Sequence, residues 1–160
     1  MIITRNAARG LALALLVLGA ATGSAVGQGK APAPDFLVTK RSAHEFAETL
    51  NLLRQAIEAE NLMVVQEVNP QKMLRMVGVK VGGMRQLYFF HPRYMKQILE
   101  TNRNAGIEPP LKLLVMEAPD GRVLVRYEKP QHQFGPYDGL TEFAAEMAGI
   151  FDRVVGSVTE

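Results

Sequence analysis

The chain has 160 residues, which leaves room for one domain rather than two. Apolar residues make up 48% and charged residues 21%, a balance typical of globular proteins, and the absence of cysteine excludes disulfides, thiolate zinc sites, cysteine nucleophiles and cysteine-linked lipid anchors. The formal charge of +2 comes from Arg5 and Arg9, because the other 16 basic side chains are matched by 16 acidic ones. The residues after 27 therefore have no net charge and give no reason to expect a nucleic-acid partner.

Residues 1–27 have the pattern of a secretory signal peptide. Two arginines precede an unbroken apolar run over 11–18, which is too short to span a bilayer of about 30 Å. Small residues follow and predict cleavage after Ala25 or after Gly27. We therefore expect a periplasmic or secreted protein with no stable membrane anchor after cleavage. An uncleaved N-terminal anchor is the alternative.

The expected mature domain covers residues 36–160. It follows a short extended linker over 28–35, in which two prolines stand among small residues. A β-branched and aromatic run predicts a first strand over 36–40. Ser42 and Glu45 have the spacing of a capping box, which predicts that a helix begins there.

The next elements are a long helix, a strand and a short helix. Helical spacing places Leu50, Leu53 and Ile57 on one buried face. A second strand is predicted over 62–68. Asn69 followed by proline predicts a short helix to about residue 76, with the asparagine as N-cap.

An apolar run predicts a third strand over 86–90, stopped by a His-Pro pair. A helix over 93–103 follows, with Tyr94 and Ile98 facing inward. Two further strands are predicted over 111–117 and 122–128, because the Ala-Pro-Asp-Gly sequence between them is typical of a hairpin turn.

A polar loop is expected over 131–139, and a final helix after it. That helix carries a continuous apolar stripe, formed by Leu140, Phe143, Ala144, Met147, Phe151, Val154 and Val155. The predicted order is β-α-β-(short α)-β-α-β-β-α. This order indicates an α+β sandwich, with helices packed on one face of a mainly antiparallel sheet.

Four stretches together resemble the family called domain of unknown function 302. They are Phe89-Phe90-His91-Pro92, the run over 98–115, Asp120-Gly121 and Tyr127. The resemblance covers about residues 37–155 and is most specific over 87–128. It implies one small domain with a fold similar to the TATA-binding-protein-like α+β class, and it implies no catalytic or ligand-binding residue. The chain departs from the family pattern where Phe90 and His91 replace the usual glycine and asparagine.

The segment over 129–137 is the first candidate site. It carries His132, Gln133, Phe134 and Tyr137. Polar and aromatic groups on a loop over a sheet often line small-molecule sites. We expect such a site between this loop and the strand end at His91. The alternative is a connection whose aromatic side chains only fix it to the core.

A metal site is the second candidate. His91 and Met95 are four residues apart at a helix start, and with His132 they offer the imidazole and thioether ligands that suit copper or haem iron. The alternative is that the methionines fill the core, as expected for Met63, Met73, Met116 and Met147.

A basic strip is the third candidate. Arg122 and Arg126 share one face of a predicted strand and could meet Lys112 on its neighbour, which would suit an anion. Glu117 and Glu128 lie nearby in the sequence and are expected to neutralise them. A solvated face is therefore the expectation.

Catalysis has the weakest support, because the sequence has neither a nucleophile elbow nor a phosphate-cradling loop. The sequence predicts a non-catalytic module that binds an unknown small ligand or an exported protein. The alternative is a periplasmic copper or haem carrier. A homodimer formed through an unpaired sheet edge is also open.

Overall fold

The computed structural model describes residues 34–159. The predicted signal peptide over 1–27 and most of the predicted linker over 28–35 lie outside these residues. Within the described part, no helix is both long enough and apolar enough to cross a bilayer.

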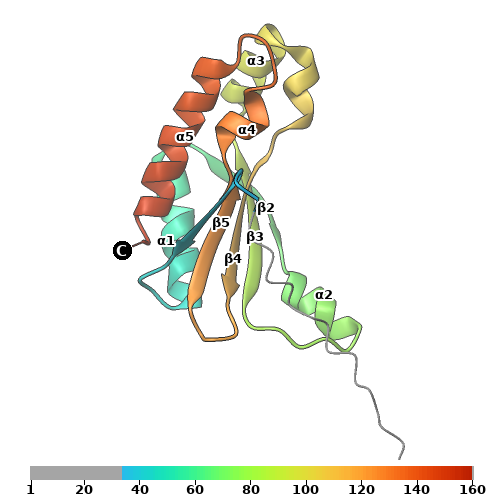
Figure 1. The fold of residues 1–160 in the computed structure, drawn as a ribbon. Coiled ribbons are helices and arrows are strands. Elements are labelled where there is room, and N and C mark those ends of the chain that lie inside the picture. Colours follow the sequence, from blue (N-terminus) through green and yellow to red (C-terminus); the bar gives the residue numbers. More distant parts are fainter. Residues whose placement is uncertain (1–33, 160) are drawn as a thin grey trace, which may run out of the picture. The chain divides into compact units, whose positions relative to one another are not determined.

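Five antiparallel strands form one sheet, in the order β1-β5-β4-β3-β2 (Figure 1). Its strands are β1 (Leu37–Arg41), β2 (Met63–Val68), β3 (Met84–Phe90), β4 (Leu111–Glu117) and β5 (Val123–Glu128). The helices are α1 (Phe46–Ala59), α2 (Pro70–Met76), α3 (Pro92–Thr101), a 3-10 helix η1 (Arg103–Ile107), α4 (Pro130–Phe134) and α5 (Thr141–Gly156). The predicted α+β sandwich is confirmed, with α4 and η1 added to the expected order.

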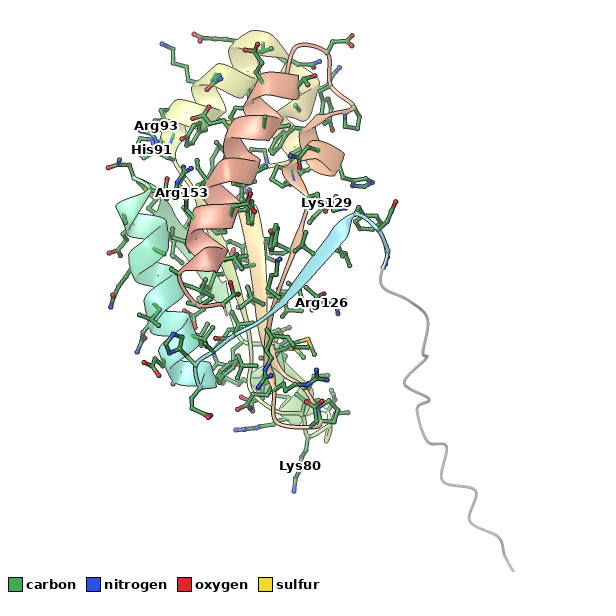
Figure 2. The ribbon with its side chains drawn as sticks, turned by 60° about the vertical axis from the view of Figure 1, so that its left-hand side comes forward. Lys80, His91, Arg93, Arg126, Lys129 and Arg153 are labelled. Atoms are coloured by element: carbon green, nitrogen blue, oxygen red, sulfur yellow. The ribbon has the colours of Figure 1, made fainter. Side chains whose placement is uncertain are left out.

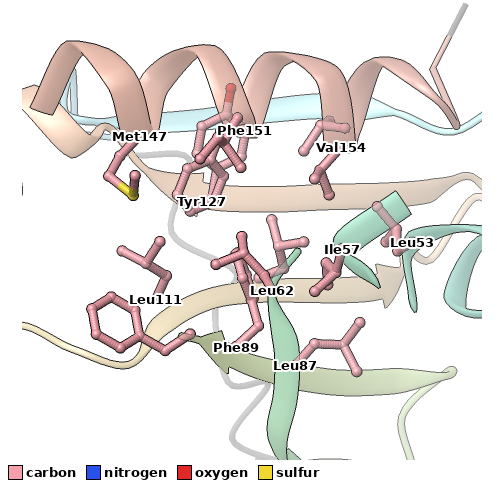
Figure 3. Close-up of a cluster of buried hydrophobic side chains, with 14 of the residues drawn as sticks. Leu53, Ile57, Leu62, Leu87, Phe89, Leu111, Tyr127, Met147, Phe151 and Val154 are labelled. Carbon is pink, nitrogen blue, oxygen red and sulfur yellow. The ribbon is translucent and has the colours of Figure 1, made fainter. Parts of the chain in front are cut away.

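Helices α1 and α5 cover one face of the sheet (Figure 3). Alternation along each strand explains this face, because Leu87 pairs with Leu113 and Val115 pairs with Val125 across the ladders, and all four are fully buried. The apolar stripe predicted for the final helix packs on them; its members from Phe143 to Val155 are buried. The core therefore lies between this face and the two helices.

The opposite face of the sheet carries mostly polar side chains. Gln86 and Tyr88 of β3 pair with Leu114 and Lys112 of β4, and Arg126 of β5 pairs with Leu114. All five are half-buried or exposed. This face is therefore the side from which solvent reaches the strands.

Ser42 does not cap α1, contrary to the capping-box prediction. The helix begins at Phe46, and its N-cap residue, Glu45, makes no side-chain cap. Ser42 is buried and bridged to Thr159, and its hydroxyl accepts the backbone N–H of His44, which precedes the helix, rather than one from the first turn. Its hydroxyl instead lies 2.7 Å from the buried Thr49 hydroxyl and donates to the Val158 carbonyl.

Two of the four methionines predicted to fill the core do not. Met147 is fully buried, whereas Met63 and Met73 are 46% and 59% exposed. Met63 lies on β2, an edge strand, and Met73 lies on α2, which buries none of its residues. An apolar side chain on a short peripheral element has too little neighbouring surface to be enclosed.

An ion pair joins the end of α1 to α5. Arg153 donates through Nε and Nη2 to the two carboxylate oxygens of Glu60, at 2.7 and 2.8 Å. The hydrogen bonds from Arg153 hold the pKa of Glu60 below its ordinary value. Because the folded-state pKa is lowered, this stabilisation is present above pH 4.5 and is lost as the pH falls through the folded-state value.

We therefore expect the free energy of unfolding of Glu60→Gln to depend less on pH in the acid range than that of the natural chain. The variant should lose stability at pH 7, while the difference from the natural chain should vanish once the pH is below both pKa values. Urea unfolding from pH 2 to pH 7 measures this. Glu58→Gln is the matched control, since Glu58 is exposed on the same helix and makes no ion pair within the described residues. A difference that persists unchanged at pH 2 contradicts the assignment.

Candidate functional site: a cavity between two diverging strands

Strands β4 and β5 separate at one end of the sheet. Their ladder ends at the pair Leu114–Arg126, although β4 continues pairing with β3 as far as Leu111 and β5 continues pairing with β1 as far as Glu128. In an unbroken register Lys112 would face Glu128. The two strands instead leave an opening, which we call the β4–β5 gap.

A cavity of about 330 Å³ lies in the β4–β5 gap. Water occupies about 30 Å³ per molecule, so the cavity has the volume of roughly eleven waters. Phe151 of α5 lines it from the core side, while Lys112 and Glu128 come from the two strands. The remaining lining residues are Tyr88, Ile107, Glu108, Pro109, Pro110 and Gln133.

The segment joining η1 to β4 is fastened to α4 beside the cavity. Tyr137 donates its hydroxyl hydrogen to Glu108 Oε1 at 2.5 Å, and Gln133 donates from Nε2 to the Glu108 carbonyl at 3.1 Å. The hydrogen bond with the Glu108 carboxylate raises the pKa of Tyr137. These two bonds hold one wall of the cavity against α4.

Glu128, on the other side of the cavity, is held in a similar way. His132 Nδ1 lies 2.6 Å from Glu128 Oε1, one helical turn away in sequence. The imidazole ring also stacks on Phe36, with the ring centroids 4.4 Å apart. One carboxylate oxygen of Glu128 thus has a protein partner, and its position is fixed by α4 and the chain entering β1.

Among residues 34–159, Lys112 is the one cation that lines the cavity. Its side chain is exposed, and no ion pair among residues 34–159 involves it. Its ammonium group therefore has hydrogen-bond donors available to a ligand. The cavity combines this cation with two carboxylates, one amide and an aromatic wall.

The structure divides the predicted site residues among three places. His132 and Tyr137 hold the carboxylates of the β4–β5 gap, as just described. Phe134 is fully buried, packed edge-on against Phe143 at 4.9 Å between centroids. His91 lies at the end of β3, and Figure 2 shows it on the other side of α5 from Lys129, the residue before α4.

His91 and Met95 line a second, apolar hollow of about 280 Å³, together with Met63. The structure thus brings two of the three proposed metal ligands to one place and leaves His132 at another. His91 Nδ1 accepts the backbone N–H of Arg93 at 3.1 Å and so caps α3. In the neutral imidazole Nε2 then carries the proton, whereas a metal-bound histidine normally donates from its other ring nitrogen.

The predicted polar loop over 131–139 contains the helix α4. Proline at the first helical position favours it, because proline needs no hydrogen-bond acceptor there and its φ is already helical. This short helix places Gln133 and His132 on the side of the two carboxylates. The loop prediction was wrong in its local structure.

The predicted basic strip is not assembled. Arg122 pairs with Asp120 in the hairpin turn, and Arg126 donates to Thr39 of β1 at 3.0 Å. Glu117, expected to neutralise the strip, instead accepts the backbone N–H of Gly83 on the other face. Lys112 is the residue of this strip that lines the cavity in the β4–β5 gap.

Glu108 and Phe151 were not predicted as site residues, whereas Gln133 belongs to the predicted candidate loop. Phe151 was predicted as core, and it is core and cavity wall together. Glu108 follows the Ala-Gly sequence and precedes two prolines, which indicated only a loop. No sequence signal marks the end of the β4–β5 ladder, on which the cavity depends.

The described residues thus form one α+β domain, with a cavity at one end of its sheet. The chain belongs to the family of domain of unknown function DUF302, whose family model matches residues 38–158. It is similar to the crystal structure of the uncharacterized conserved protein DUF302 from Bacillus stearothermophilus, with 21% sequence identity and a TM-score of 0.72. The match covers 78% of this chain and 99% of that one, and at this identity it shows the fold. No curated protein matches the chain.

Proposed function

We propose that the chain is an exported, non-catalytic module that binds a small ligand in the β4–β5 gap. The observation that carries this proposal is a cavity with an apolar wall at Phe151 and an unpaired cation at Lys112. Small-molecule sites have volumes of about 300–1,000 Å³ and use a few fixed polar groups to orient the ligand. Export rests on the signal-peptide pattern of residues 1–27, which gives periplasmic or secreted localisation.

The polar side chains that line the cavity favour ligand binding over catalysis. Glu108 and Glu128 are each held by one partner, which fixes their positions for recognition. Among the described residues that line the cavity there is no serine, threonine or histidine. Fixed donors and acceptors without an activated nucleophile suit a module that holds its ligand unchanged.

A copper or haem carrier is the second candidate. Its support is the hollow shared by His91, Met95 and Met63, since thioether and imidazole ligands select soft metals. The cap that His91 gives to α3 opposes it, because binding through Nε2 requires a proton on the Nδ1 that now accepts from Arg93. Losing such a cap costs about 1 kcal/mol of helix stability.

Native mass spectrometry distinguishes the two candidates. The protein is recovered from the exported fraction without chelators, and its metal content is measured in parallel. We expect a mass that begins after Ala25 or Gly27 together with a small organic adduct, and we expect Lys112→Gln to lose the adduct. Lys96→Gln is the control, since Lys96 is an exposed lysine on α3 outside the cavity.

A stoichiometric metal or haem mass that is lost in His91→Ala contradicts the proposal and supports the carrier. A bare mass in every preparation contradicts both. The same spectrum decides whether a second copy of the chain is the partner, because edge strands β1 and β2 each leave one side of the sheet unpaired within the described residues.

A further inference from the structure

Charged side chains of both signs line the β4–β5 gap. Lys112 stands on β4, Glu128 stands on β5, and Glu108 stands three residues before β4 begins. The lining therefore carries one positive and two negative charges. No two of these three groups pair with each other among residues 34–159, but Glu128 pairs with His132 through Oε1, so its other carboxylate oxygen is the one left for a ligand.

Each carboxylate has one oxygen engaged and one without a protein partner. Glu108 Oε1 accepts from Tyr137, and Glu128 Oε1 lies beside His132. No hydrogen bond in the described part of the chain reaches Oε2 of either residue. Two free acceptor oxygens in one cavity suit a group with several N–H donors, such as an ammonium.

A ligand with a single charge does not match this lining. An anion would pair with Lys112 but would be repelled by two carboxylates, and a cation would leave Lys112 unpaired. A ligand with both charges pairs every group. Apolar contact is available as well, because Ile107 is 79% exposed at the rim and Phe151 lies at the wall.

We propose that the β4–β5 gap binds a small zwitterion of amino-acid type, with its carboxylate toward Lys112 and its ammonium toward Glu108 and Glu128. The inference rests on the proposed function and adds the ligand class. The cavity volume, equal to about eleven waters, suits a ligand of roughly ten non-hydrogen atoms. An apolar side chain on that ligand would face Phe151.

Isothermal titration calorimetry of the mature protein with two matched sets of probes tests this ligand class. One set is leucine, 4-methylpentanoate and isopentylamine, and the other is phenylalanine, 3-phenylpropanoate and 2-phenylethylamine. Within each set the zwitterion is expected to bind at least tenfold more tightly than either singly charged analogue. Each charged group that an analogue lacks then accounts for about a factor of ten in affinity.

Variants assign the two ends of the ligand. Lys112→Gln is expected to weaken zwitterion binding at least tenfold while leaving amine binding unweakened. Glu128→Gln and Glu108→Gln are expected to weaken both. Lys96→Gln, on α3 and outside the lining, should change nothing. Circular dichroism on each variant confirms folding, and the two glutamate variants serve as checks on each other.

Three results overturn the inference. A carboxylic acid that binds as tightly as its amino acid makes the gap an anion site, and an equally tight amine makes it a cation site. If none of the six probes binds but native mass spectrometry shows an organic adduct, the ligand belongs to another class and the proposed function stands. If none binds and no adduct exists, both fail.

Discussion

Replacing Phe151 by alanine is expected to lower the free energy of unfolding by about 3–5 kcal/mol, the usual cost of removing a buried phenylalanine. Phe151 is 2% exposed, stacks on Tyr127 at 4.6 Å and meets Phe89 edge-on at 5.5 Å between ring centroids (Figure 3). The variant leaves a void between α5 and the sheet. Since small domains are stable by only about 5–15 kcal/mol, the loss is a large fraction of the total.

Urea unfolding followed by circular dichroism measures this loss. Val65→Ala is the control, because Val65 is 53% exposed on the edge strand β2 and should change stability by less than about 0.5 kcal/mol. Phe151→Leu should fall between the two, since it keeps most of the apolar volume. A loss below about 1 kcal/mol for Phe151→Ala contradicts the packing described.

Gly135→Ala is expected to destabilise the domain by about 1–3 kcal/mol, the range for an overpacked site. A Cβ at Gly135 would lie 2.3 Å from the Gln131 carbonyl oxygen, and a backbone atom cannot rotate away. Helix α4 must therefore shift, and Gln133 and Tyr137 would shift with it. We expect ligand affinity to fall together with stability, because these two residues hold Glu108.

Gly156→Ala is the matched control for Gly135→Ala. No atom lies within 4 Å of a Cβ built at Gly156, and this glycine ends α5 and does not line the cavity. Its replacement should leave stability unchanged or raise it slightly, as alanine restricts the unfolded chain. Equal losses in both variants, measured by urea unfolding, would refute a steric origin at Gly135.

The fold followed from local sequence patterns. The stripe containing Met147 and Val154 identified the final helix, and alternation around Val125 identified the buried strand face. Such patterns report which side of an element is apolar. They do not report how far two strands stay paired, so the end of the ladder at Leu114 and the cavity beyond it could not be predicted.

The site prediction placed His91 and His132 together, and the structure holds them on different elements. Each follows a strand, but β4 lies between those two strands in the sheet, and the order of strands depends on packing rather than on local sequence. The Phe134 side chain was expected beside a ligand and is enclosed by Phe143 instead. In the sequence, an aromatic residue in a polar segment looks the same whether its side chain contacts a ligand or is buried in the core.

Amide chemical-shift mapping tests the central claim, that the β4–β5 gap holds the ligand. Nitrogen-15-labelled mature protein is titrated with a mixture of small acids, amines, amino acids and sugars. We predict that the shifts centre on Lys112, Glu128 and Gln133, while His91 and Met95 remain unchanged. Shifts confined to His91 and Met95, or no shifts at all, would contradict the account.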